Sequence, residues 1–378
     1  MFRVFFLGGK MEDKDYMRMA LSLAKKGMGW TSPNPMVGAV IVKDERIIGE
    51  GYHHRCGGLH AEREALAACS EDPKGGTIYV TLEPCCHTGR QPPCTEALVG
   101  AGISRVVIGS SDPNPLVAGK GIEYLRKHGI EVETGVLEEE CDAINYVFFH
   151  YITTGTPYVV MKYAMTMDGK IATGNGASKW ITGEAARKDV HEQRSHYRAI
   201  MVGVGTVIAD DPMLDCRIEG GRNPVRIICD THLRTPMDSR IVRTAREIPT
   251  IMVAGAVSCE RKAAYIEAGC RVYSLPERDG MVDLSSLIER LGQEEIDSIL
   301  IEGGASLNWS AMRSGIVNRV LAYIAPRLFG GELAKSPVGG EGVGYPDQAM
   351  ALKDVTVREL GNDFLIEGEV KSNVYRIS

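Results

Sequence analysis

The most informative segments of the sequence are His60-Ala61-Glu62 and Pro84-Cys85-Cys86-His87-Thr88-Gly89-Arg90-Gln91-Pro92-Pro93-Cys94. His60, Cys85 and Cys94 offer three soft ligands to a tetrahedral zinc ion and leave its fourth position to water. Glu62 stands two residues after His60, close enough to exchange protons with that water without binding the metal. These residues predict a catalytic zinc site.

The residues around the three ligands predict how the chain would position them. Thr77–Leu82 is a β-branched, apolar run typical of a buried strand, so Cys85 should lie on the turn that follows it. Thr95 should begin a helix beside Cys94, and helix N-termini stabilise thiolates. His60 opens an alanine-rich stretch, Ala61–Cys69, which is expected to be helical.

Two other interpretations of these segments stay open. Cysteine and histidine also occur as ordinary buried residues without any metal. A purely structural zinc site would need a fourth protein ligand, which Cys86, His87 or Cys56 could supply. The ordered occurrence of ligands, carboxylate and Pro-Cys favours the catalytic site.

The same segments resemble the zinc deaminases, and more narrowly the bifunctional deaminase/reductases of bacterial riboflavin biosynthesis. The loop of that family reads Pro-Cys-x-His-x-Gly-(Lys/Arg)-Thr-Pro-Pro-Cys, and here only Gln91 departs from it. Three further motifs agree: Asn34-Pro35-x-Val37-Gly38, Gly51-Tyr52-His53 and Asp112-Pro113-Asn114-Pro115. The resemblance implies a cytidine-deaminase-like fold, Glu62 as the catalytic residue, and substrate contacts from Asn34, His53, His87 and Arg90.

Composition limits the class of protein. With 378 residues, of which 44% are hydrophobic and 24% charged, the chain is long enough for two domains with sizeable cores. A net charge of −6 argues against a nucleic-acid partner, and no stretch has the length of a membrane span. The ten cysteines show no disulfide-like framework, which predicts a reducing, cytoplasmic location.

Strand and helix patterns alternate through both halves, which predicts two α/β domains, the first an α/β/α sandwich. Expected elements of the first half are the helices 15–28 and 119–128, a hairpin of 37–42 with 46–49, and strands 105–108 and 131–136. Expected strands of the second half are 157–165, 199–204, 225–229, 250–254 and 298–301. The polar segment Thr153–Pro157 is the expected joint, giving an N-terminal extension 1–10, a deaminase domain 11–155 and a reductase domain 156–378.

The second half carries weaker local signals. Gly203-x-Gly205 follows a strand, but Ile208 stands where a dinucleotide fingerprint needs a third glycine, so a Rossmann site is not expected. Glu302-Gly303-Gly304 links a buried strand to a helix, where bare backbone N–H groups can hold a phosphate. A glycine pair is equally common at plain structural turns.

The resemblance extends to this half through Lys162-x-Ala164-x-Thr166-x-Asp168-Gly169-Lys170, where the family has serine in place of Thr166. It implies a dihydrofolate-reductase-like domain that binds NADPH. The implied cofactor residues are Ala164, Trp180, Thr206, Asp210, Thr231, Gly304, Ala305, Ser306, Leu307, Asn308, Trp309 and Ser310. The implied substrate residues are Ser178, Arg194, Leu214, Arg217 and Glu302.

Two arginines of this set suit a sugar phosphate, because Arg194 and Arg217 can donate forked, charge-assisted hydrogen bonds. Without the resemblance they would equally fit a solvated helix face and a surface loop. Lys162 and Asp168 flank an apolar strand, and the sequence assigns neither of them a role.

The resemblance implies two consecutive steps of riboflavin synthesis, a zinc-dependent deamination and an NADPH-dependent reduction. It also implies a small pyrimidine ribose-phosphate substrate and a homo-oligomer, dimer or tetramer. One alternative is a nucleoside, nucleotide or tRNA deaminase with an unrelated second domain. Another is a reductase whose zinc module is not catalytic.

Overall fold

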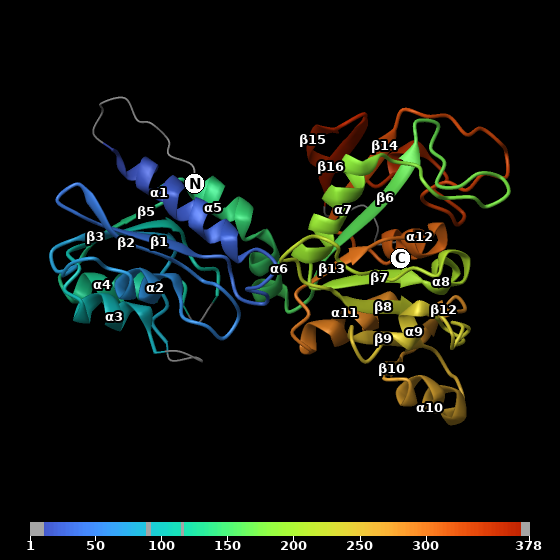
Figure 1. Cartoon of the computed structure of the whole chain (residues 1–378), viewed down its shortest axis with the longest axis horizontal. Coiled ribbons are helices and arrows are strands. Elements are labelled where there is room, and N and C mark those ends of the chain that lie inside the picture. The colour runs from blue at the N-terminus through green and yellow to red at the C-terminus, as the bar shows by residue number, and fades with distance from the viewer. Residues whose placement is uncertain (1–10, 88–91, 115–116, 372–378) are drawn as a thin grey trace. The chain divides into compact units, whose positions relative to one another are not determined.

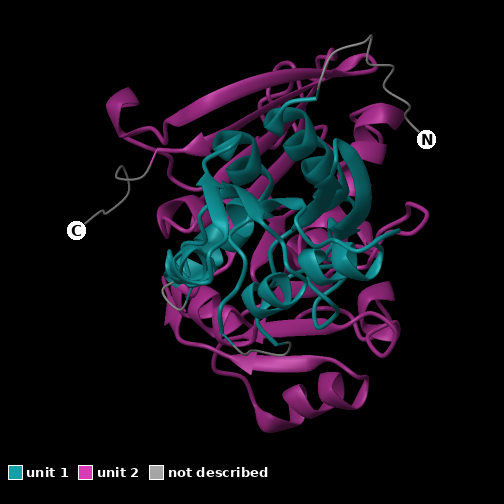
Figure 2. Cartoon of the chain, turned by 90° about the vertical axis from the view of Figure 1, so that its left-hand side faces the viewer, with its two compact units in different colours: residues 1–154 teal, residues 155–378 magenta. Residues whose placement is uncertain are grey.

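The computed structural model describes residues 11–87, 92–114 and 117–371. The chain forms two compact units, residues 1–154 and 155–378, each with its own sheet and hydrophobic core (Figures 1 and 2). Expectations that concern residues 1–10, Arg90 and Gln91 fall outside the described residues. Within the described ranges, no helix combines the length and apolar composition that crossing a bilayer requires.

The first unit is built on a five-stranded sheet in the order β2-β1-β3-β4-β5. β1 pairs antiparallel with β2 and β3, whereas β3, β4 and β5 run parallel. A two-residue turn at Asp44 (φ 49°) and Glu45 (φ 60°) joins β1 to β2, as the sequence predicts. The strands are β1 (Gly38–Lys43), β2 (Arg46–Tyr52), β3 (Thr77–Leu82), β4 (Arg105–Ser110) and β5 (Glu131–Thr134).

Helices cover both faces of this sheet (Figure 1). Alternate residues of β1 separate the two cores: Ala39 and Ile41 face α2, α3 and α4, whereas Val40 and Val42 face α1 and α5. The expected three-layer arrangement is therefore confirmed. The helices are α1 (Asp13–Ala24), the 3₁₀ turn η1 (Lys25–Gly27), α2 (Ala61–Ala67), α3 (Cys94–Gly100), α4 (Lys120–Lys127), α5 (Glu138–Ile144) and α6 (Tyr146–Thr154).

Two expected boundaries of the first unit were wrong. The first helix ends at Ala24 and tightens into a 3₁₀ turn, where Gly27 passes so close to His53 that a Cβ would lie 2.5 Å from its carbonyl oxygen. Thr153 and Thr154 belong to α6 and not to a joint. Their hydroxyls donate to the carbonyls of Phe149 and His150 and so satisfy the last turn of the helix.

The second unit contains a nine-stranded sheet in the order β10-β9-β8-β7-β13-β6-β14-β16-β15, with a separate β11–β12 ladder. Strands from β10 to β14 in this order run parallel, and β16 runs antiparallel to its two neighbours. The strands are β6 (Tyr158–Thr166), β7 (Ala199–Gly203), β8 (Val225–Cys229), β9 (Thr250–Ala254), β10 (Arg271–Ser274), β11 (Glu277–Arg278), β12 (Met281–Val282), β13 (Ser298–Ile301), β14 (Arg319–Ala325), β15 (Leu352–Leu360) and β16 (Asp363–Val370).

The parallel strands are sandwiched between two hydrophobic clusters, one formed with α11 and α12 and the other with α8, α9 and α10. Their carboxyl ends meet at one edge of the sheet, where open α/β sheets bind ligands. The helices are α7 (Glu184–His196), α8 (Val204–Asp210), α9 (Arg240–Arg243), α10 (Cys259–Glu267), α11 (Leu284–Gln293), α12 (Ala305–Arg313) and the 3₁₀ turn η2 (Pro346–Gln348).

Candidate active sites

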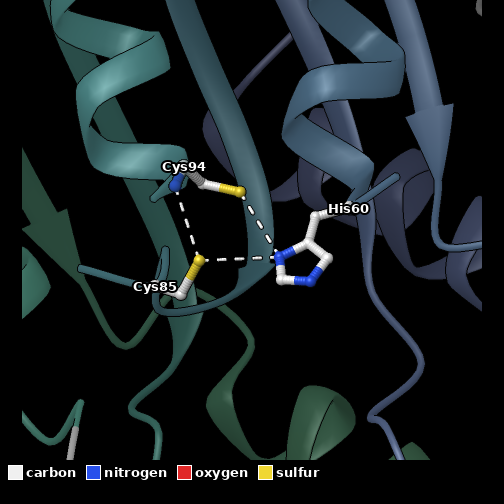
Figure 3. A group of neighbouring side chains, drawn as sticks. All are labelled: His60, Cys85 and Cys94. Carbon is white, nitrogen blue, oxygen red and sulfur yellow. Dashed lines mark hydrogen bonds between the residues drawn. The ribbon is translucent and has the colours of Figure 1, made fainter. Parts of the chain in front are cut away.

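Three side chains from separate elements of the first unit converge on one point (Figure 3). His60 precedes α2, Cys85 lies on the turn after β3, and Cys94 is the first residue of α3. The Nδ1 atom of His60 lies 3.5 Å from Sγ of Cys85 and 3.4 Å from Sγ of Cys94. The strand–turn–helix framework thus brings together the three residues that the sequence singles out.

The arrangement fits a zinc ion. With Zn–S near 2.3 Å and Zn–N near 2.05 Å, a tetrahedral ion would hold its nitrogen and sulfur ligands about 3.5 Å apart. The three ligand atoms all lie within 4.8 Å of one another. Among the described residues no further histidine, cysteine or carboxylate joins the group, so a structural site with Cys86, His87 or Cys56 as fourth ligand is not favoured.

Local hydrogen bonds favour the thiolate form of Cys85. A hydrogen bond from Cys94, with further help from His60, lowers the pKa of the Cys85 thiol against the opposing effect of burial, and the same bond raises the pKa of the Cys94 thiol. The backbone N–H of Cys94, at the start of α3, also donates to Sγ of Cys85 over 3.4 Å. Thiolates are the form of cysteine that binds zinc.

Glu62 lies in the first turn of α2 with 3% of its surface exposed. Burial raises the pKa of its carboxyl group to about 7, and the nearby Cys85 charge adds to the effect. Cys94 acts on this pKa in the opposite direction, so the Glu62 carboxyl group lies within reach of the ligand cluster. A carboxyl group with a pKa near neutrality suits proton transfer in both directions.

Asn34 and His53 form a fixed pair next to this cluster. Nδ1 of His53 bonds to the carbonyl oxygen of Leu59 over 2.8 Å, which leaves Nε2 to accept from the Asn34 amide over 3.1 Å. Burial lowers the pKa of His53 and so keeps its ring neutral. The rings of His53 and His60 meet edge to face at 5.5 Å. Two of the expected substrate residues therefore adjoin the ligands.

A third expected residue, His87, has a buried Nδ1 atom without a hydrogen-bond partner among the described residues. Burial raises the pKa of the neighbouring Asp112 to about 6, although the N–H of Asn114 donates to it over 2.8 Å. Glu83, which the sequence analysis did not assign to the site, accepts from the N–H groups of Gly119 and Gly121 and ties the zinc turn to α4.

In the second unit, a pocket of about 750 Å³ opens at the carboxyl ends of the parallel strands. Glu302 lines it together with most of the expected cofactor and substrate residues: Ala164, Ser178, Thr206, Asp210, Thr231, Gly304, Ala305, Ser306, Leu307, Asn308 and Ser310. A volume of this size can hold a dinucleotide-sized ligand.

The turn between β13 and α12 forms part of the pocket wall. Gly303 (φ 104°) and Gly304 (φ 83°) both adopt left-handed backbone conformations that other residues rarely tolerate. A Cβ on Gly303 would meet no atom within 4 Å, so this position needs glycine for its conformation and not for space. The free N–H groups at the start of α12 can therefore face an anionic ligand.

Glu302 carries two basic partners at the end of β13. Nε and Nη2 of Arg194 donate to its carboxylate over 2.6 and 3.0 Å, and Nζ of Lys162 lies 3.3 Å away. Burial alone would raise the pKa of Glu302, but the charges and hydrogen bonds of Arg194 and Lys162 outweigh it and lower the pKa to about 2. Lys162, to which the sequence gave no role, thus belongs to the pocket.

Five expected residues lie outside the described pocket wall. Trp180 is 64% exposed and stacks on Arg187, and Leu214 is 3% exposed within a hydrophobic cluster. Arg217 pairs with Asp215 on the surface. Arg194 reaches the pocket through Glu302, and Trp309 lies on the face of α12 that packs against Gly340. Their assigned roles stay predictions.

Comparison with known proteins supports the interpretation of the sites in both units. Residues 157–366 match the RibD C-terminal domain, and residues 10–110 match the cytidine and deoxycytidylate deaminase zinc-binding region. The chain is 56% identical to the riboflavin biosynthesis protein RibD of Actinobacillus pleuropneumoniae over 357 residues, which cover 94% of this chain and 95% of that protein. The chain belongs to the RibD family.

Other RibD proteins support this assignment. RibD of Escherichia coli is 41% identical over 85% of this chain and 90% of its own length. The structure of Acinetobacter baumannii RibD superposes with a TM-score of 0.84 at 37% identity, covering 95% of this chain and 99% of that one. A deaminase/reductase from Thermotoga maritima gives a TM-score of 0.82 at 38% identity, with the same coverage.

Membership of the RibD family confirms the expected folds, cytidine-deaminase-like in the first unit and dihydrofolate-reductase-like in the second. The chain is a bifunctional deaminase and reductase of riboflavin biosynthesis, with zinc and NADPH as the cofactors of its two units. Because the RibD match spans both units, neither an unrelated second domain nor a non-catalytic zinc module is favoured.

Proposed function

We propose that residues 11–155 deaminate 2,5-diamino-6-ribosylamino-4(3H)-pyrimidinone 5′-phosphate, and that residues 156–378 reduce the resulting 5-amino-6-(5-phosphoribosylamino)uracil to its ribityl counterpart. The similar Thermotoga maritima protein is a diaminohydroxyphosphoribosylaminopyrimidine deaminase/5-amino-6-(5-phosphoribosylamino)uracil reductase. Support from this chain comes from two separate sites, a three-ligand cluster with a buried carboxyl group and a pocket at the edge of a parallel sheet.

In the deamination, His60, Cys85 and Cys94 would hold the zinc ion, which would supply Lewis-acid activation of water. Glu62 takes a proton from the water as it attacks the carbon that bears the 2-amino group, and delivers a proton to the departing ammonia. The neutral His53 ring orients the Asn34 amide toward the pyrimidine. The unpartnered Nδ1 of His87 provides a further polar contact, and Arg90 completes the expected set.

In the reduction, NADPH held in the pocket of the second unit would supply a hydride to the ribosyl carbon that is bonded to nitrogen, while the bond from that carbon to the ring oxygen breaks and the oxygen takes up a proton from solvent to become a hydroxyl group. The Gly303–Gly304 turn and the start of α12 would hold the pyrophosphate of the cofactor. Glu302, held by Arg194, accepts hydrogen bonds from the sugar hydroxyls, and the Ser178 hydroxyl, which donates to Asp210, lines the same pocket. Arg217 lies near the surface and binds the substrate phosphate.

The observation that carries this proposal is the buried Glu62 carboxyl group next to the His60–Cys85–Cys94 cluster. The test measures zinc content, ammonia release and NADPH oxidation in parallel, with the diamino substrate supplied. One zinc ion per chain and ammonia that appears before NADPH is consumed would support both activities and their order. Ammonia release without NADPH oxidation would overturn the reductase assignment alone.

We further propose a cytoplasmic homo-oligomer, dimer or tetramer. None of the ten cysteines forms a disulfide bond, which supports a reducing compartment. The outermost strand, β15, is exposed along most of its length and carries Val355 and Val357, which are 52% and 62% exposed. Light scattering across a concentration series would test the assembly, and a monomer at all concentrations would contradict it.

A further inference from the structure

The ammonium group of Lys162 has two partners in the second unit. One is the carboxylate of Glu302, 3.3 Å from Nζ. The other is the ring of Tyr323, because Nζ lies over the ring face at 5.6 Å from its centroid. That distance is within the range of a cation–π interaction. Tyr323 has no role in the site described above, although it is fully buried beside a residue that lines the pocket.

The sheet places these three residues side by side. β13, β6 and β14 are neighbours, and Glu302, Lys162 and Tyr323 lie on them or directly after them in that order. Lys162 follows Met161, which belongs to the core cluster formed with α11 and α12, so Lys162 projects from the opposite face of the sheet. Tyr323 projects from that same face, because its partner in β6 is Ala164, two residues beyond Lys162.

The hydroxyl end of the Tyr323 ring is anchored to α7. It donates to Oδ2 of Asp189 over 2.5 Å, and both side chains are buried. Arg358 donates to Oδ1 of Asp189 over 3.3 Å, so each oxygen of this carboxylate has a partner. Burial raises the pKa of Tyr323, and the bond to Asp189 adds to the effect, so the hydroxyl group stays protonated and remains a donor.

The helix α7 therefore fixes both partners of Lys162. Arg194, in its last turn, donates to Glu302. Asp189, earlier in the same helix, accepts from Tyr323. A lysine side chain loses much rotational freedom when its ammonium group is held, and partners that hold it beforehand reduce what a ligand must order. Charged groups assist a reaction most when they are oriented before it begins.

We propose that Tyr323 is a positioning residue of the reductase: the face of its ring, anchored by Asp189, holds the Lys162 ammonium group in the pocket beside Glu302. The inference rests on the proposed reductase function. Because Tyr323 is fully buried, its effect on the reaction passes through Lys162. Loss of the ring should therefore lower kcat for the reduction and leave the KM for NADPH unchanged.

The test measures the kinetics of NADPH oxidation by the full-length protein with the deaminated substrate supplied. Tyr323→Leu removes the ring, and kcat should fall by about 5- to 30-fold, as the loss of a cation–π interaction implies, while the KM for NADPH changes by less than about twofold. Tyr323→Phe keeps the ring and removes only its hydroxyl group, so kcat should stay within about twofold of the wild-type value.

A second measurement does not depend on the folding of Tyr323→Leu. A trifluorinated phenylalanine at position 323 keeps the ring, but fluorine withdraws electron density from the ring face that attracts the ammonium group. Its kcat should be lower than that of Tyr323→Phe. Equal kcat values for these two proteins would overturn the inference, because the ring would then act by its shape alone.

Leu291→Ala is the matched control, because Leu291 is fully buried in α11, in the core cluster on the opposite face of the sheet. This variant should lower the resistance to urea, as Tyr323→Leu does, but keep kcat within about twofold of wild type. The inference fails if Leu291→Ala loses as much kcat as Tyr323→Leu, if Tyr323→Phe is as slow as Tyr323→Leu, or if Tyr323→Leu keeps the wild-type kcat. Wild-type protein that does not oxidise NADPH would instead overturn the reductase function itself.

Discussion

Arg194 and Glu302, which lie 108 residues apart, form a two-pronged ion pair with both side chains largely buried. The pair links α7 to the carboxyl end of β13 and holds the Glu302 carboxylate ionised beside Lys162. A buried pair of this kind contributes little net stability, but either charge without its partner is strongly unfavourable. The pair therefore makes the pocket depend on an interaction between distant segments.

Replacing Arg194 with methionine should destabilise the second unit by about 3–5 kcal/mol, because Glu302 would remain buried without its main counter-charge. Urea unfolding followed by tryptophan fluorescence measures this change. In a Trp30→Phe background the signal comes from Trp180 and Trp309 alone, both of which lie in the second unit.

The matched control is Arg290→Met, which removes an exposed pair with Glu294 on the surface of α11. Exposed pairs of this type contribute at most about 1 kcal/mol. If the two variants lost similar free energies of unfolding, the buried Arg194–Glu302 pair would contribute no more than an exposed ion pair.

The pKa of Glu302 predicts how the stability of this unit depends on acidity. Folding lowers this pKa from about 4.5 to about 2, so the contribution of Glu302 is complete above about pH 4.5 and is lost as the pH falls toward 2. The loss should approach about 3 kcal/mol. Unfolding free energies of wild type and Glu302→Gln, measured from pH 6 to pH 3, should differ by an amount that changes below pH 4.5. A difference independent of pH would contradict this.

Strands with a strong local pattern were predictable from the sequence. β3, β8, β9 and β13 have the bounds that their apolar runs predict. β14, β15 and β16 were missed, although β14 is largely buried; β15 (Leu352–Leu360) is exposed on both faces and shows no burial pattern. Its position is set by pairing with β16, which no local signal encodes.

In the two sites, too, local features were predictable from the sequence and long-range contacts were not. His60, Cys85 and Cys94 were predictable because ligand type and spacing are local features. The contacts of Lys162 and Arg194 with Glu302 join segments more than 100 residues apart, and only the folded sheet brings them together. Arg226, fully buried within β8, was not foreseen either. Its guanidinium donates five hydrogen bonds, to acceptors on α9, β9 and the neighbouring loops, whose approach the sequence does not reveal.

Zinc binding should depend on Cys94 and not on Cys86. Cys94→Ser removes one of three ligands, so the variant should lose most of its zinc and its ammonia release, while NADPH oxidation with the deaminated substrate continues. Cys86→Ser should retain one zinc ion per chain, because Cys86 is not part of the ligand group. Metal analysis of both purified variants makes the comparison. Zinc loss in Cys86→Ser would instead favour the alternative interpretation, a structural zinc site in which Cys86 is the fourth protein ligand.

Glu62→Gln should lower the rate of ammonia release by about 10²- to 10⁴-fold, because an amide of the same shape cannot carry protons between water and the leaving group. Zinc content and reduction of the deaminated substrate should remain unchanged, which separates proton transfer from metal binding and folding. Glu96→Gln is the control, since Glu96 is an exposed acid in the first turn of the neighbouring α3. Ammonia release at the wild-type rate in Glu62→Gln would remove Glu62 from the mechanism. Zinc loss in that variant would instead give it a role in holding the metal.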